Sequence, residues 1–177
     1  MYGTCTFEEA KQKVAALCIA EPSLSVTDIA NRVSLTEAEA SLALPAEMVT
    51  AVSGGNAELI LGQLPEWGNV TTITNSFGSI FEFKGPFPKG KTAHGYYNIM
   101  GKAGLHGHLK LDLITNIAFV SKQFHGTDTH HIAFFNAGGN CVFRVYLGRD
   151  KARHLIPEQI EAFNGMKQSF NDVAMAE

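Results

Sequence analysis

Histidine is the residue type whose placement in this chain points to chemistry. The sequence holds seven histidines, and six of them fall between His94 and His131. His106 and His108 are two residues apart, so on a β-strand both imidazoles would lie on one face. Imidazole nitrogen is a ligand for zinc and for haem iron. The spacing indicates either a protein metal site or a surface that offers an axial ligand to a bound haem.

Aromatic and cationic side chains in the same half of the chain favour the haem interpretation. A haem macrocycle needs a broad apolar surface, an axial nitrogen, and cations for its carboxylates. The candidate aromatic residues are Phe77, Phe81, Phe83, Tyr96, Tyr97, Phe119 and Phe124. The candidate cations are Lys89, Lys91, Lys102, Arg144 and Arg149. Many of these aromatic side chains would equally serve as ordinary core.

Other kinds of site have weaker support in the sequence. A zinc site at His106 and His108 needs further ligands, and Asp112 is the one acidic residue placed nearby. Asp128 with His130 or His131 would make an Asp–His pair, but such pairs are also common in structural networks. The chain has no G-x-S-x-G motif and no P-loop. Three widely spaced cysteines, at 5, 18 and 141, are typical of reduced structural thiols.

The net charge and the N-terminal sequence indicate the cellular location of the protein and the partners that it does not bind. A formal net charge of -3 disfavours non-specific binding to nucleic acid and to anionic membranes. The first residues lack the basic and apolar regions of a signal peptide. Since no apolar run reaches the ~18 residues that a bilayer span needs, we expect a cytoplasmic protein without a membrane anchor.

The elements that would position the histidines are predicted from periodicity. Apolar spacing and capping residues predict helices before residue 66, at Thr6–Leu17, Ser25–Arg32, Leu35–Leu44 and Asn56–Leu64. Alternating and β-branched patterns then predict strands at Asn69–Thr74, Ser79–Phe83, Ala93–Met100, Gly107–Leu113, Asn116–Phe124, His131–Phe135 and Cys141–Leu147. A closing helix follows at Glu158–Val173.

This order predicts an α+β fold in one compact domain. A helical region, 1–66, precedes an antiparallel-sheet region with a closing helix, 67–177. In the last predicted strand, Arg144 and Tyr146 alternate with apolar residues, so we expect them to keep their polar groups available.

The second and third predicted helices have the apolar spacing of a helix-turn-helix. A recognition helix normally presents basic or amide side chains to DNA. Thr36–Leu44 instead carries Glu37 and Glu39 and no basic residue. We therefore interpret this stretch as a packing module, and a regulator that binds nucleic acid is a distant alternative.

Six segments in a fixed order resemble the HutX/ChuX family of intracellular haem-utilisation carrier proteins. They are Glu66–Thr72, His94–Asn98, Gly104–Leu109, Thr127–Asn136, Tyr146–Asp150 and Pro157–Phe163. The resemblance implies a saddle-shaped antiparallel sheet with flanking helices. It also implies a homodimer whose two halves together resemble one larger haem-processing protein of the HemS/ChuS type. The implied function is to bind haem in the cytosol and to pass it to a haem-degrading partner protein.

The resemblance also assigns site residues. The family's haem-linked histidine in the strand of Gly104–Leu109 matches His108, which becomes the expected iron ligand. A second family histidine, at the end of the strand after Glu66–Thr72, matches Asn75, a poor iron ligand. Beyond what the resemblance implies, His94, His106, Tyr96 and Tyr97 are alternatives for the ligand that Asn75 does not supply. Lys91 and Arg149 are candidate partners of the haem carboxylates.

A haem carrier and a haem-degrading, haem oxygenase-like enzyme are the two functions to separate. A degrading enzyme must activate oxygen beside the ring and receive electrons. No flavin or iron–sulfur motif is visible in the sequence. We therefore expect a non-catalytic carrier, with room for weak haem breakdown when a reductant is added.

Overall fold

The computed structural model of the chain describes residues 5–102 and 104–174, and their arrangement is α+β as predicted. A six-stranded antiparallel sheet has the strand order β1-β7-β8-β9-β2-β3, and a smaller sheet has the order β4-β5-β6. The strands of the large sheet are β1 (Val49–Ser53), β2 (Asn69–Ser76), β3 (Ser79–Pro86), β7 (Ile114–Phe124), β8 (Thr127–Asn136) and β9 (Cys141–Tyr146). Those of the small sheet are β4 (Gly90–Ala93), β5 (Tyr96–Met100) and β6 (His106–Leu109).

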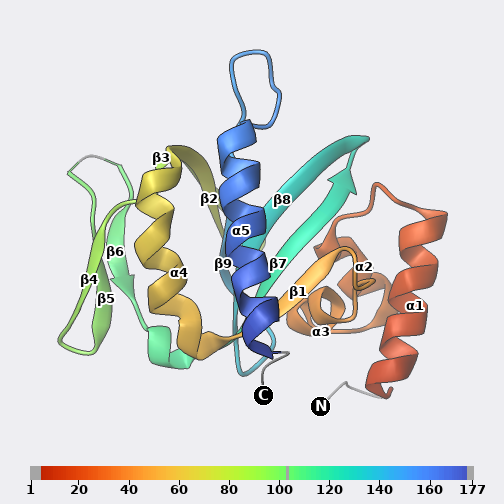
Figure 1. The fold of residues 1–177 in the computed structure, drawn as a ribbon. Helices are drawn as coiled ribbons and strands as arrows, with labels where there is room; N and C mark the ends of the chain where they lie inside the picture. The colour runs from red at the N-terminus through yellow and green to blue at the C-terminus, as the bar shows by residue number, and fades with distance from the viewer. Residues whose placement is uncertain (1–4, 103, 175–177) are drawn as a thin grey trace.

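Three helices at the N-terminus form one layer on the large sheet (Figure 1). They are α1 (Phe7–Ala20), α2 (Val26–Val33) and α3 (Glu37–Leu42). Each begins with a capping box, in which a Ser or Thr side chain and an acidic side chain three residues later satisfy each other's backbone N–H groups. Their buried residues, such as Val14 and Ile29, pack on Val120 and Phe135 of the sheet. The helix-turn-helix-like stretch therefore belongs to this packing layer.

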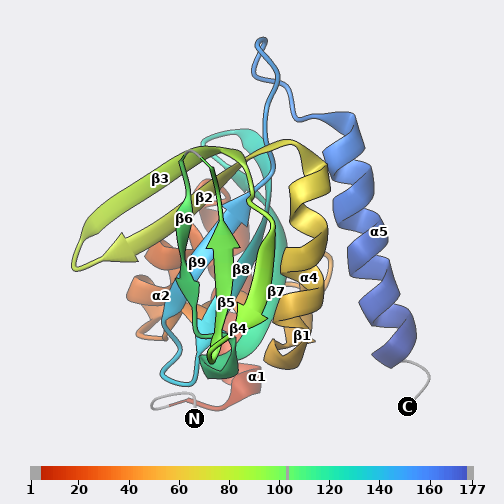
Figure 2. The same cartoon turned by 90° about the vertical axis from the view of Figure 1, so that its left-hand side faces the viewer.

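The opposite face of the large sheet is covered by α4 (Ala57–Gln63), α5 (Pro157–Ala174) and the small sheet (Figures 1 and 2). Leu61 of α4 and Phe163 of α5 are fully buried there with Phe119 and Phe134 of the large sheet. Tyr97 and Ile99 of β5 join the same core. No helix within the described residues is both long and apolar enough to cross a membrane.

The strands differ from the prediction at three places. The predicted strand Gly107–Leu113 is shorter in the structure, because β6 ends at Leu109 and Leu111–Leu113 form a 3-10 helix. Strand β1 lies inside the region 1–66 that was predicted to be helical, and it is held by pairing with β7 rather than by a local pattern. The predicted strand Ala93–Met100 is divided into β4 and β5 by a tight turn at His94–Gly95. Both turn residues have positive φ, 54° and 76°, as a two-residue type I′ hairpin turn requires.

The sequence prediction for Arg144 was wrong. Its side chain was expected to be available at the surface, but the residue is 8% exposed. Arg144 points toward the N-terminal helices and forms an ion pair with Glu37 at the start of α3. The helical layer therefore covers β7, β8 and part of β9, and contacts the sheet through a charged pair as well as through apolar packing.

Candidate functional site

The predicted histidine pair lies on the outer face of the small sheet. Strand alternation turns Tyr97 and Ile99 into the core and leaves Tyr96, Asn98 and Met100 on the opposite face. Asn98 is registered opposite His108, and Met100 is opposite His106. Directly opposed residues share a face, so one surface gathers the residues that we call the histidine face: Lys91, Tyr96, Asn98, Met100, His106 and His108.

Asn98 fixes the orientation of the His108 ring. The Asn98 amide nitrogen donates to the carbonyl oxygens of Lys91, Ala93 and Tyr96, each at 3.1 Å. Its Oδ1 therefore faces His108, whose Nδ1 lies 2.6 Å away. Because an amide oxygen only accepts, His108 Nδ1 carries the proton and the neutral ring keeps its lone pair on Nε2. A metal-binding histidine is typically oriented in this way by a partner on its other nitrogen.

Aromatic and apolar groups surround this imidazole. The ring centroid of Tyr96 is 6.0 Å from that of His108 in an edge-on arrangement, and His106 is 6.2 Å away. The Lys110 ammonium lies 5.1 Å from the centre of the Tyr96 ring. Tyr96 is 41% exposed and Met100 is 55% exposed. The face therefore offers an oriented nitrogen donor beside accessible apolar surface and a cation.

The other residues proposed with His108 are distributed differently. His94 is exposed in the β4–β5 turn at one end of the histidine face. Lys91 lies in β4 opposite Asn98 and is exposed. Tyr97 is 3% exposed on the core side, where burial raises the pKa of its phenol. The structure therefore separates the two tyrosines, and Tyr96 is the one that shares a face with His108.

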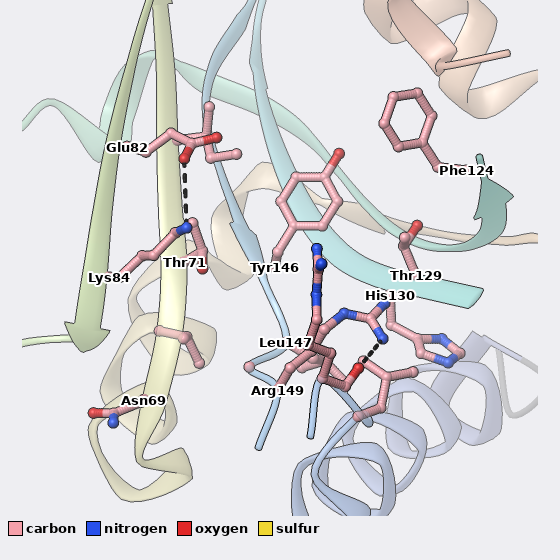
Figure 3. A pocket seen from close by; sticks show the side chains of 15 residues that line it. Asn69, Thr71, Glu82, Lys84, Phe124, Thr129, His130, Tyr146, Leu147 and Arg149 are labelled. Carbon is pink, nitrogen blue, oxygen red and sulfur yellow. Dashed lines mark hydrogen bonds and ion pairs between the residues drawn. The ribbon is translucent and has the colours of Figure 1, made fainter. Parts of the chain in front are cut away.

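Arg149 lies in a different part of the molecule, at a cavity of about 710 Å³ that we call the sheet pocket. Figure 3 shows Glu82 and Lys84 of β3 on one side of this pocket, Phe124 and His130 on the other, and Tyr146 between them. The Arg149 guanidinium donates to the carbonyl oxygens of Asp128 at 2.6 Å and Arg153 at 3.0 Å. These bonds hold the cation at the pocket, away from the histidine face.

The lining of the sheet pocket is amphipathic. His130 is half-buried, and its Nδ1 is 2.8 Å from the Ser121 hydroxyl. Burial lowers the pKa of His130, which favours the neutral ring. Burial raises the pKa of Tyr146, despite the opposing effect of the nearby Arg144 guanidinium. With a volume within the usual range for small-molecule sites, the pocket suits a flat ligand that has both apolar and anionic parts.

Neither Tyr146 nor Lys84 was predicted from the sequence to be a haem-site residue, and His130 was considered only as a partner of Asp128. Tyr146 is the first residue of Tyr146–Asp150, one of the segments that carried the family resemblance. That position in the segment was the feature of the sequence that could have pointed to Tyr146 as a site residue. Asn75, at the position of the missing family histidine, is exposed near the end of β2. It lies two residues beyond Ile73 on the strand face that lines the pocket.

Comparisons with known proteins agree with the resemblance found in the sequence. The family model for haem utilisation ChuX/HutX matches residues 50–166. The intracellular haem transport protein HutX of Vibrio cholerae is 52% identical over 164 residues, which are 92% of this chain and 85% of that protein.

Solved structures extend the comparison to the fold. The haem-binding protein ChuX is 33% identical with a TM-score of 0.82, and the match covers 92% of this chain and 99% of that one. Holo-PhuS, a haem-binding protein of Pseudomonas aeruginosa, shares the fold at 15% identity with a TM-score of 0.73. That match covers 86% of this chain but only 46% of PhuS, a longer chain.

Proposed function

Because this chain belongs to the ChuX/HutX haem-utilisation family, we propose that it is an intracellular carrier that binds haem and delivers it to a haem-degrading protein. The proposal is supported by HutX, a relative named for haem transport, and by ChuX, a relative named for haem binding. Haem is the cargo of such a protein, so the site must hold the iron firmly and still release it.

The pairing of His108 with Asn98 is the observation that carries this proposal. It leaves the Nε2 lone pair of an exposed imidazole free to bind iron. Tyr96 and Met100 supply apolar surface for part of the ring, and Lys91 or Lys110 supplies charge for a carboxylate. His106 and His94 are the neighbouring imidazoles that would serve as alternative ligands.

The exposure of this face favours a carrier over an enzyme that degrades haem. Ring oxidation requires an oxygen molecule to be activated on the iron in a site that excludes competing reactions. His106 and His108 are both exposed, and they lie on β6, an edge strand of the small sheet. An open face of this kind suits release to a second protein.

We also propose that the carrier is a homodimer formed through the β-rich part. The β2–β3 hairpin projects from the body (Figure 2), and β3 is an edge strand of the large sheet. Phe77 at its tip is 108% exposed, and Ile80 and Phe81 are 66% and 60% exposed. An edge strand with such side chains is a surface that proteins normally cover. A second copy of the hairpin surface would cover it, and two copies would approach the length of PhuS.

An optical haem titration at neutral pH tests the binding proposal. We expect a Soret shift that saturates near one haem per chain. His108→Ala should change the Soret position and speed haem release, whereas His106→Ala should have a smaller effect. His154, an exposed residue paired with Asp150, provides the matched control variant His154→Ala. Identical spectra and release rates for wild type and His108→Ala would remove His108 as the ligand.

Delivery needs a separate test with a haem-degrading enzyme as acceptor. If haem passes within a complex, the transfer rate should rise and saturate with the acceptor concentration, and should exceed the rate of spontaneous release. A transfer rate equal to the rate of spontaneous release at every acceptor concentration would refute direct delivery. The protein would then store haem without passing it to the acceptor in a complex.

A further inference from the structure

A second, smaller cavity of about 50 Å³ lies where the N-terminal helices meet the sheet. We call it the basic cavity. Its lining includes Lys122 of β7, His131 of β8, Arg144 and Tyr146 of β9, and Ser25 at the start of α2. These residues come from the two layers of the protein, and none belongs to the histidine face.

The charges around the basic cavity do not balance. Lys122 is only 7% exposed, and its ammonium donates to the carbonyl oxygens of Pro22 at 2.6 Å and Gln123 at 3.2 Å. Neither acceptor carries a charge, and no ion pair involves Lys122 among the described residues. Glu37 is already paired with Arg144. One buried positive charge therefore remains without a counter-charge, which is unfavourable in a protein interior.

Two nearby groups that can carry a negative charge, Asp28 and Cys18, do not compensate Lys122. Asp28 accepts from the Ser25 hydroxyl at 2.6 Å and also from its backbone N–H, within the capping box of α2. Burial raises the pKa of the Cys18 thiol, which therefore stays protonated beside Lys122. Neither Asp28 nor Cys18 therefore supplies a counter-charge to Lys122.

His131 adds an unused hydrogen-bonding group. The residue is 4% exposed, and its ring lies 4.5 Å from the Tyr146 ring. Within the described chain, its Nδ1 atom is buried and has no hydrogen-bond partner. Burial, together with Arg144 and His130, lowers the pKa of His131 to about 3, so the imidazole is neutral and one of its nitrogens carries a proton to donate.

We propose that the basic cavity is a binding site for one small negatively charged group, a halide ion or a carboxylate, held by Lys122 with His131 and Tyr146. A cavity needs about 10–15 Å³ of this kind of volume to hold one water molecule, so the basic cavity has room for a chloride ion or a carboxylate. The bound charge would compensate Lys122 at the junction of the helical layer and the sheet.

The anion has two possible sources that share this chemistry. One is a free ion from solution. The other is a carboxylate of a ligand in the sheet pocket, because Phe124, Thr129 and Tyr146 line both cavities. The second source rests on the proposed haem function and requires a haem that lies in the sheet pocket instead of on the histidine face, so the two sources are tested separately.

Thermal unfolding of the haem-free protein tests whether a free halide ion binds in the basic cavity. Sodium chloride is exchanged at constant ionic strength for sodium isethionate, whose anion is a sulfonate and offers neither a halide nor a carboxylate. A ligand that binds only the folded state at about ten times its Kd should raise the Tm by roughly 3 °C. Lys122→Met should abolish the difference between the salts, whereas Lys13→Met, which removes an exposed charge of α1, should preserve it. Bromide-soaked wild-type crystals should show anomalous density beside Lys122.

A comparison of the binding of haem and of haem dimethyl ester tests whether a haem carboxylate occupies the basic cavity. If a cargo carboxylate enters the cavity, Lys122→Met should weaken haem binding about tenfold and leave binding of the ester unchanged. Equal Tm values in both salts, no bromide density, and equal effects of Lys122→Met on haem and ester would together overturn the proposal. A positive salt response without haem binding would preserve the anion site and count against the carrier function instead.

Discussion

His108 and Asn98 face each other across β6 and β5, with His108 Nδ1 2.6 Å from Asn98 Oδ1. The Asn98 amide is itself held by three backbone carbonyl oxygens of the β4–β5 hairpin. The direction in which His108 presents its free nitrogen is thus set by the hairpin backbone before any ligand arrives. Pre-orientation of this kind lowers the entropy lost on binding.

Asn98→Ala should weaken haem binding without removing the ligand. Loss of a group that orients a metal-binding histidine typically lowers metal affinity by 10–100-fold, and we expect an effect of about that size here. The measurement is haem Kd by optical titration, with circular dichroism to confirm the fold. Thr92→Ala is the control, because Thr92 lies in the same hairpin but bonds to Glu58 instead. An Asn98→Ala variant with the wild-type Kd and spectrum would contradict the orienting role.

Asn75→His should restore the histidine that the family resemblance places on β2. Asn75 is exposed on the strand face that continues from the sheet pocket, so a histidine fits there without entering the core. If this position meets the iron, the variant should bind ferric haem more tightly and shift its spectrum toward the low-spin form. Ser76→His, one residue along and on the opposite strand face, is the matched control. Equal spectra for the two variants would place the second ligand elsewhere.

Local pattern predicted much of the histidine face. Two-residue spacing placed His106 and His108 together, and the structure confirms this. Alternation along β5 separates Tyr96 from Tyr97, but the sequence could not say which of them faced outward. Asn98 orients His108 because β5 and β6 pair in the register that places these two residues opposite each other. The sequence of one strand does not determine that register.

The remaining differences arise from contacts between distant segments. Strand β1 is short and exists through its ladder with β7. Arg144 occupies a polar position in the alternating pattern of β9, as a surface residue would. Glu37, far away in the sequence, forms an ion pair with it at the junction with the helical layer, where Arg144 is buried. The sheet pocket likewise combines residues of β2, β3, β8 and β9 whose proximity follows from the strand order. Sequence periodicity thus predicts the helices and strands and their buried faces. The cavities depend on which distant segments pack against one another, and periodicity does not predict that.

The homodimer should depend on the β2–β3 hairpin. Phe77→Ser combined with Phe81→Ser removes two exposed aromatic side chains from the proposed contact, and should convert a dimer into a monomer of 19.2 kDa. Light scattering at micromolar concentration measures the mass. Leu59→Ser, at a 56% exposed position on α4, is the control for loss of surface hydrophobicity. A wild-type protein that is already monomeric would refute the dimer.

Glu37→Gln should destabilise the contact between the helical layer and the sheet. The substitution leaves the Arg144 guanidinium, 8% exposed, without its ionic partner. Breaking such a pair from one side costs about 3 kcal/mol in the free energy of unfolding, measured by chemical denaturation. Glu8→Gln breaks the exposed Glu8–Lys11 pair instead and should cost less than about 1 kcal/mol. Equal losses for both variants would mean that Arg144 does not depend on Glu37.

Stability should fall in mild acid because of His131. Burial, Arg144 and His130 lower the pKa of His131 to about 3 in the folded protein, whereas an unfolded chain has the ordinary value of 6.5. Between these two values the unfolded state binds a proton that the folded state does not bind. The free energy of unfolding therefore decreases as the pH falls through 6.5, by about 1.4 kcal/mol per pH unit once below it. Burial also lowers the pKa of His130, which adds an effect in the same direction.

Replacing His131 with Phe isolates this contribution. The variant removes the titrating nitrogen and keeps a flat ring beside Tyr146, so its absolute stability is less informative than its pH dependence. Denaturant unfolding at pH 7.0, 6.0 and 5.0 in chloride-free buffer, where no halide can raise the pKa of His131, should give a shallower loss for His131→Phe than for wild type. His154→Phe, at an exposed position, should keep the wild-type slope. If wild type and His131→Phe lost stability in parallel, the imidazole would have to be protonated in the folded protein. That would require a counter-charge beside His131, and the basic cavity is the place where one would bind.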